Sequence, residues 1–136
     1  MMSNTPLVLI IDDDPGVLFL HKIIVKEGNL SKSPATFLDA AQALEFILPL
    51  DSSGTKILIF LDINMPRING WEFLELLGEK IQHADIKVIM VTSSLSIAER
   101  EKSKEYNVVI DFWEKPMDEI QVSALIGNLG DWLVVE

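Results

Sequence analysis

Short, almost uninterrupted apolar runs recur along the chain, and amphipathic stretches separate them. The clear runs are LVLII at Leu7–Ile11, ILIFL at Ile57–Leu61, KVIMV at Lys87–Val91 and VVIDFW at Val108–Trp113. The first three are continuous rather than alternating, which is typical of strands buried on both faces of a parallel sheet. A weaker strand is expected at Ser33–Leu38, where Pro34 favours an edge position because proline cannot donate to a sheet ladder.

The stretches between these runs carry helical spacing and recognisable helix starts. Asp14-Pro15 places proline in a first helical turn, Asp39 is a suitable N-cap, and Ser96-x-x-Glu99 has the pattern of a capping box. Strand and helix alternate five times, and right-handed crossovers then require helices on both faces of one sheet. The pattern predicts one three-layer α/β domain over residues 1–136, with a core from about residue 6 to 130. The predicted helices are Pro15–Lys26, Asp39–Leu48, Asn69–Lys80, Ser96–Tyr106 and Asp118–Leu133.

The chain is acidic and contains no cysteine. Its formal net charge of -10 disfavours direct binding to DNA or RNA, because nucleic-acid phosphates would be repelled. The lack of cysteine excludes disulfides and cysteine-based zinc sites, and His21 and His83 form no metal-binding motif. No apolar stretch approaches the ~20 residues that span a bilayer, and the N-terminus lacks the basic region of a signal peptide. We therefore expect a soluble cytoplasmic protein that does not enter a membrane.

Acidic side chains follow two of the predicted strands. Asp12, Asp13 and Asp14 follow the first strand, and Asp62 follows the strand in the middle of the chain. Ligands of open parallel sheets bind beyond the carboxyl ends of the strands, so Asp12, Asp13 and Asp62 are expected to converge there. Such oxygen ligands suit Mg²⁺, and a carboxylate beside the ion could act as nucleophile toward a phosphoryl group. Asp is also favoured at helix starts and in turns, and for Asp14 this structural interpretation is the stronger one.

Polar residues also follow the last two strands. Thr92, Ser93 and Ser94 could donate a hydroxyl hydrogen bond to a phosphoryl oxygen, although such clusters also begin turns and cap helices. Lys115 and Pro116 follow the fifth strand. A lysine here could neutralise a phosphoryl oxygen, and a Lys-Pro bond at a strand end is a candidate cis peptide.

Taken in order, these strand ends resemble the receiver domains of two-component response regulators. The resemblance covers nearly the whole chain, and its specificity lies in the ordered set rather than in any single motif. It implies a flavodoxin-like, doubly wound sheet of five parallel strands in the order 2-1-3-4-5, the order of chemotaxis receivers. The matching elements are Asp12-Asp13 after LVLII, Asp62 in LDINMP, Thr92 in VIMVTSS, and Phe112 with Lys115-Pro116 in DFWEKP.

The resemblance implies roles for the residues around the acidic cluster. Asp62 matches the phosphoacceptor of the family. Asp13 matches the acid that binds Mg²⁺ (or Mn²⁺) directly, Asp12 matches its partner, which often acts through water, and the backbone carbonyl of Asn64 matches the third protein ligand. Asn64 and Ser94 match positions whose side chains tune the lifetime of the acyl phosphate. Exchanging either residue is expected to change the dephosphorylation rate without abolishing phosphorylation.

The resemblance also implies a switch. Thr92 and Lys115 match the pair that binds the phosphoryl oxygens, and Phe112 matches an aromatic that changes rotamer as Thr92 moves toward the phosphate. The peptide bond between Lys115 and Pro116 matches one that is usually cis in the family. The surface of the fourth helix, fifth strand and fifth helix would report the change.

Two positions and the C-terminal tail depart from the family pattern. Trp113 stands where a smaller aliphatic residue is usual, and Asp111 stands where a small residue is common. The tail Gly127–Glu136 is apolar for a terminus, and contact with a partner is one interpretation of it. Packing on the domain itself is the favoured interpretation for its large residues Trp132, Leu133, Val134 and Val135.

The function implied by the resemblance is phosphorelay signalling. A sensor histidine kinase or a histidine phosphotransfer protein would supply the phosphoryl group, and a protein target would read the switch in trans. Pairing of two copies through the reporting surface is compatible with this reading. Beyond self-phosphorylation and self-dephosphorylation, no enzyme activity is expected. The alternatives are a phosphorylation-independent binding module and a phosphohydrolase of the haloacid dehalogenase type, which would need a second acid in place of Asn64.

Overall fold

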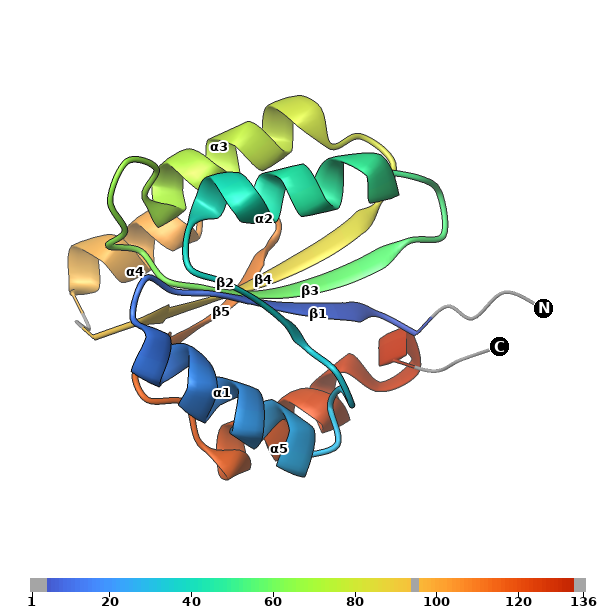
Figure 1. The fold of residues 1–136 in the computed structure, drawn as a ribbon, viewed down its shortest axis with the longest axis vertical. Helices are drawn as coiled ribbons and strands as arrows, with labels where there is room; N and C mark the ends of the chain where they lie inside the picture. Colours follow the sequence, from blue (N-terminus) through green and yellow to red (C-terminus); the bar gives the residue numbers. More distant parts are fainter. Residues whose placement is uncertain (1–4, 94–95, 134–136) are drawn as a thin grey trace.

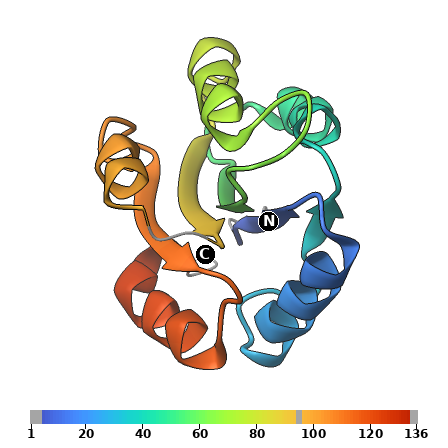
Figure 2. The same ribbon diagram turned by 90° about the vertical axis from the view of Figure 1, so that its left-hand side faces the viewer.

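A computed structural model describes residues 5–93 and 96–133. Five parallel strands form one sheet in the order β2-β1-β3-β4-β5, as predicted. Helices α2, α3 and α4 cover one face of the sheet, and α1 and α5 cover the other (Figures 1 and 2). The strands are β1 (Leu7–Ile11), β2 (Ala35–Phe37), β3 (Lys56–Leu61), β4 (Asp85–Thr92) and β5 (Val109–Glu114).

Helix starts agree with the predicted capping residues. The helices are α1 (Pro15–Glu27), α2 (Ala40–Ile47), α3 (Gly70–Lys80), α4 (Ile97–Ser103) and α5 (Glu119–Leu129), with short 3-10 turns η1 (Leu48–Leu50) and η2 (Gly130–Leu133). The Asp14 carboxylate accepts hydrogen bonds from the N–H groups of Gly16 and Val17, so this acid caps α1. Asp39 caps α2 in the same way. Among the described helices, none is long and apolar enough to cross a bilayer.

Two helix ends differ from prediction by more than one residue. Helix α4 ends at Ser103 rather than Tyr106, because the next residues donate to carbonyls three positions back, as in Tyr106 N–H to Ser103 O. Such bonds make tight turns instead of continuing an α-helix. The last predicted helix divides at Gly130, which has a φ of 48°. Glycine adopts a positive φ readily, and from Gly130 to Leu133 the chain forms the 3-10 turn η2 instead of continuing the α-helix.

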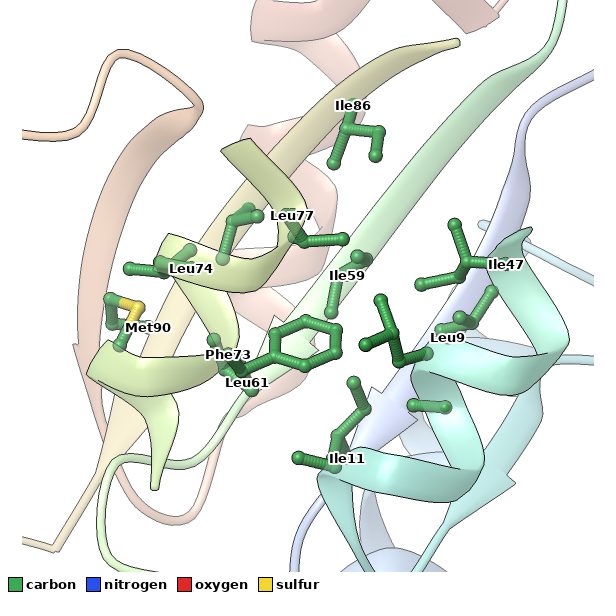
Figure 3. Close-up of a cluster of buried hydrophobic side chains, with 14 of the residues drawn as sticks. Leu9, Ile11, Ile47, Ile59, Leu61, Phe73, Leu74, Leu77, Ile86 and Met90 are labelled. Carbon is green, nitrogen blue, oxygen red and sulfur yellow. The ribbon is translucent and has the colours of Figure 1, made fainter. Parts of the chain in front are cut away.

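The central strands β1, β3 and β4 are mostly apolar, because each contributes side chains to two cores, one on either face of the sheet. On β1, Leu9 and Ile11 face α2 and α3, whereas Val8 and Ile10 face α1 and α5. The larger cluster packs β1, β3 and β4 against the inner faces of α2 and α3 (Figure 3). Double-sided burial explains why the runs do not alternate between apolar and polar residues.

An irregularity in β5 decides which side of the sheet Phe112 faces. Val109 pairs with Val88, but the next register pair is Asp111 with Ile89, so Ile110 is an extra residue that forms a bulge. Side chains alternate along a strand, and one extra residue exchanges the two faces for everything that follows. Phe112 consequently joins the cluster on the α2–α4 side.

The two departures from the family pattern in β5 contact each other. The indole ring of Trp113 is buried against Phe60 in the other core, with ring centroids 5.7 Å apart. Its Nε1–H donates to the Asp111 carboxylate at 2.9 Å. A buried indole needs a hydrogen-bond acceptor, so the presence of Trp113 accounts for an acid at position 111.

The C-terminal tail packs on the domain at the end of the sheet remote from the acidic cluster. The Trp132 indole N–H donates to Asp85 at 2.7 Å, and the Lys56 ammonium donates to the Trp132 carbonyl oxygen at 2.6 Å. Trp132 and Leu133 also pack against the α1/α5 core. The predicted packing is confirmed for these two residues, while Val134 and Val135 lie outside the described residues.

Gly70, the first residue of α3, allows close approach to the segment that carries Asp62. An added Cβ would lie 2.6 Å from the carbonyl oxygen of Asp62 and 2.9 Å from Ile63 Cα. We expect Gly70→Ala to lower the free energy of unfolding by roughly 1–3 kcal/mol, because these contacts are with backbone that cannot rotate away. Gly78→Ala, in the same helix with open space around it, should instead raise stability by about 0.5–1 kcal/mol. Urea unfolding measures both, and equal effects of the two substitutions would contradict the packing argument.

Candidate functional site

The acids converge because β1 and β3 are neighbours in register. Ile11 pairs with Leu61, so Asp12 and Asp62 follow at the same edge of the sheet. The Asp62 N–H donates to the Ile11 carbonyl at 3.0 Å, which extends the ladder by one residue. Carboxylate oxygens of Asp12, Asp13 and Asp62 lie within 4.8 Å of one another. Asp12 and Asp62 are buried, whereas Asp13 is exposed.

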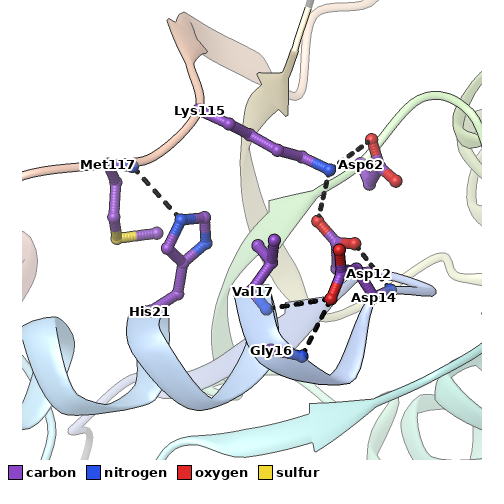
Figure 4. Close-up of polar contacts among 8 residues, drawn as sticks. All are labelled: Asp12, Asp14, Gly16, Val17, His21, Asp62, Lys115 and Met117. Carbon is purple, nitrogen blue, oxygen red and sulfur yellow. Dashed lines mark hydrogen bonds and ion pairs between the residues drawn. The ribbon is translucent and has the colours of Figure 1, made fainter.

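The Lys115 ammonium bridges the two buried acids. Its Nζ lies 2.7 Å from Asp12 Oδ2 and 3.2 Å from Asp62 Oδ1 (Figure 4). The other oxygen of Asp12 accepts a hydrogen bond from the Asp14 N–H at 2.9 Å. Asp12 is thus held from both sides, and Asp62 is oriented by the lysine.

The charges of Lys115 and the three acids around it do not balance. Burial, followed by the negative charge of Asp12, raises the pKa of Asp62 to about 6, although the Lys115 ammonium opposes the rise. Burial alone would lower the pKa of Lys115, but its hydrogen bond and charge interaction with Asp12, and then with Asp62, raise that pKa overall. One ammonium does not compensate three carboxylates. The excess negative charge, together with an exposed carboxylate at the rim, fits a site for a divalent cation with hard oxygen ligands.

The remaining predicted residues lie at neighbouring strand ends. Thr92 ends β4 and is fully buried, and its carbonyl oxygen accepts the Lys115 N–H at 2.7 Å. The Lys115–Pro116 peptide bond is cis. Phe112 is buried below the Arg100 guanidinium, which lies 5.2 Å from the ring centroid. The structure therefore brings Asp12, Asp13, Asp62 and Lys115 directly together and ties the strand end at Thr92 to the lysine.

Asn64 and Ser94 are placed differently. Asn64 lies in the loop after β3, and its side chain is exposed two residues beyond Asp62. Whether its backbone carbonyl ligates a metal stays a prediction. Ser94 lies outside the described residues.

Sequence reasoning gave no role to His21. This histidine is 1% exposed on the inner face of α1, and its Nε2 accepts a hydrogen bond from the Met117 N–H at 3.2 Å (Figure 4). Burial, and then the charge of Lys115, lowers the pKa of His21 to about 4. The available signal was its spacing, because it lies three residues after Leu18 and four before Val25 on the apolar stripe.

The chain matches the response regulator receiver domain family over residues 8–126. It belongs to that family. Among curated relatives, this receiver is 27% identical over 131 residues to the response regulator Rre1 of Synechocystis, covering 94% of this chain and 53% of that protein. It is 29% identical over 124 residues to the Synechocystis DNA-binding dual master transcriptional regulator RpaA, and the match covers 91% of this chain and 48% of that protein. The chain spans about half the length of these relatives.

Solved structures resemble the receiver along almost its full length. A two-component response regulator from Cytophaga hutchinsonii superimposes with a TM-score of 0.81 at 27% identity, covering 92% of this chain and 96% of that one. The bacteriophytochrome response regulator RtBRR gives a TM-score of 0.75 at 30% identity, and the superposition covers 93% of this chain and 78% of that one. The family resemblance and the predicted flavodoxin-like fold are both confirmed.

The buried His21 of this receiver should make stability depend on pH. Its folded-state pKa of about 4 lies below the ~6.5 of an unfolded histidine, so between these values the unfolded chain binds more protons. The free energy of unfolding is therefore undiminished by His21 above about pH 6.5, where the imidazole is neutral in both states, and it decreases as the pH falls toward 4. We expect the wild type to lose about 2 kcal/mol relative to His21→Leu between pH 7 and pH 5. Asp62 has a raised pKa, so its contribution to stability changes with pH in the opposite direction, but it is present in both proteins and cancels in the comparison. Urea unfolding at each pH measures the difference, and a difference in stability that does not change with pH would contradict the prediction.

Proposed function

We propose that this receiver is a phosphoacceptor in which Asp62 takes a phosphoryl group from a phosphohistidine. The donor is a sensor histidine kinase or a histidine phosphotransfer protein, and the phosphorylated receiver binds a protein target in trans. One observation carries the proposal: Asp12, Asp13 and Asp62 converge at one sheet edge while Lys115 bridges the two buried acids. This arrangement combines a nucleophile, a cation site and a fixed positive charge.

The chemistry assigns a task to each group. A carboxylate oxygen of Asp62 attacks phosphorus, the new P–O bond forms, and the P–N bond breaks with its electron pair retained by the imidazole nitrogen. The Lys115 ammonium orients Asp62 and neutralises charge on the phosphoryl oxygens. Asp12, Asp13, Asp62 and the carbonyl oxygen of Asn64 would hold Mg²⁺ or Mn²⁺, which supplies charge neutralisation at the transferring group when it is bound.

We assign the conformational response to phosphorylation to residues on the neighbouring strands β4 and β5. Thr92 would bind a phosphoryl oxygen through its hydroxyl, and Phe112 would change rotamer in response. A groove between α4 and β5 leads to Phe112, with Arg100, Lys104, Ile110 and other residues along it. Such a groove supports a protein target, or a second copy of the receiver, on the surface of α4, β5 and α5.

Exposed apolar residues on α1 and α5 favour a protein, rather than a small molecule, as the phosphoryl donor. Exposed apolar side chains gather on α1, where Phe19 is 68% exposed and Leu20 and Ile23 are about 40% exposed. Ile120, in the first turn of α5, is 80% exposed. Both helices begin a few residues after strand ends that form the site, so these exposed apolar side chains lie on helices that start at its edge.

Phosphorylation is tested most directly by intact mass after incubation with Mg²⁺ and acetyl phosphate. The wild type is expected to gain one phosphate, and Asp62→Asn is expected to gain none because the nucleophile is gone. Asp14→Ser serves as the matched control, since serine keeps the helix cap and Asp14 lies outside the cation site. EDTA should abolish the gain in the wild type. Persistent labelling of Asp62→Asn, or an unlabelled wild type, would overturn the proposal.

Asn64 is expected to influence the lifetime of the acyl phosphate. Its exposed side chain stands two residues after Asp62, and we infer that it restricts the approach of water to the acyl phosphate. Asn64→Ala should still be phosphorylated but should lose phosphate about five-fold faster, as a barrier lower by ~1 kcal/mol implies. Half-lives are measured by intact mass after removal of acetyl phosphate, and equal half-lives would reject this role.

A further inference from the structure

The segment that carries Lys115 is held at two points. On its N-terminal side, the Lys115 N–H donates to the Thr92 carbonyl at the end of β4 at 2.7 Å. Pro116 follows and has no N–H to donate. The next backbone donor is Met117, and its N–H is bound by His21 Nε2 at 3.2 Å. Lys115 therefore lies between an anchor on the sheet and an anchor on α1, the second of which is seen in Figure 4.

The second anchor depends on the chemistry of histidine. Met117 and His21 are each 1% exposed, so water does not readily replace the acceptor. A buried N–H without a partner costs about 1–3 kcal/mol, which favours any geometry that keeps the bond. Burial and the nearby charge of Lys115 keep the imidazole neutral, and a neutral ring has the free lone pair that this bond requires.

The structure assigns His21 as a positioning residue for Lys115, and this inference rests on the proposed function. By holding Met117, His21 fixes the turn after β5 so that the ammonium reaches Asp12 and Asp62 together. Within the part of the chain that the structure describes, His21 makes no hydrogen bond to Asp12 or Asp62, so its effect on phosphoryl transfer passes through the lysine.

The test compares three substitutions on α1. His21→Leu removes the acceptor at similar size. His21→Gln restores an acceptor oxygen the same number of bonds from the backbone as Nε2. Val25→Ala truncates a fully buried side chain one turn further along α1, which destabilises the helix packing by about 0.5–2 kcal/mol without removing the bond to Met117. Urea unfolding identifies conditions under which all three variants are folded.

The first readout is the rate of labelling by acetyl phosphate with Mg²⁺. We expect His21→Leu to be labelled about five-fold more slowly, in line with one lost hydrogen bond, His21→Gln to recover most of the rate, and Val25→Ala to match the wild type. Amide hydrogen exchange at Met117 should become faster in His21→Leu and return toward the wild-type rate in His21→Gln. Wild-type labelling of His21→Leu, or equal slowing in Val25→Ala, would overturn the inference.

A double-mutant cycle with Lys115→Ala tests the route of the effect. If His21 acts through the lysine, His21→Leu should cause no further slowing once Lys115 is absent. A full five-fold loss in that background would show that His21 acts elsewhere. If the wild type takes up no phosphate at all, the proposed function fails, whereas unchanged Met117 exchange in His21→Leu overturns the anchor independently of phosphorylation.

Discussion

The ammonium of Lys115 between two buried carboxylates is the interaction on which the site depends. Asp12 and Asp62 are brought together by the pairing of β1 with β3, and without a cation their charges would repel each other at a buried position. The end of β5 is tied to β4 and the following turn is tied to α1, and we propose that these two ties let the lysine reach both acids. The charge balance of the site therefore involves five elements of the fold: β1, β3, β4, β5 and α1.

The single positive charge of Lys115 does not balance the acids, and this imbalance suits the phosphoryl transfer that we propose. The raised pKa of Asp62 shows that its charged form is disfavoured by burial and by Asp12. A divalent cation beside Asp13 would reverse this effect and hold Asp62, the acceptor in our proposal, in its ionised form. The domain thus gives up local stability at one sheet edge, while two apolar cores on either side of the sheet maintain the fold.

Sequence patterns predicted what depends on local chemistry and on parallel topology. The strand Leu7–Ile11, the caps at Asp14 and Asp39, and the convergence of the acids all follow from residue type and position along the chain. The role of His21 did not, because its partner is 96 residues away and a single polar residue on an apolar stripe does not identify that partner. The bulge at Ile110 was equally hidden, since β-strand periodicity cannot reveal an extra residue before the register is known.

The position of Lys115 also joins the two faces of the receiver. Its N–H is bound by the strand end at Thr92, next to Phe112 on the α2–α4 side, where we place the readout. The following turn is bound by His21 on α1, whose outer face bears the apolar surface that we assign to the donor. On this view, a shift of α1 against the sheet would alter the lysine before phosphate arrives, and a shift of β4 would alter it afterwards. On this proposal the Lys115 side chain responds to both partners, because the backbone N–H of Lys115 is anchored on the sheet and that of Met117 is anchored on α1.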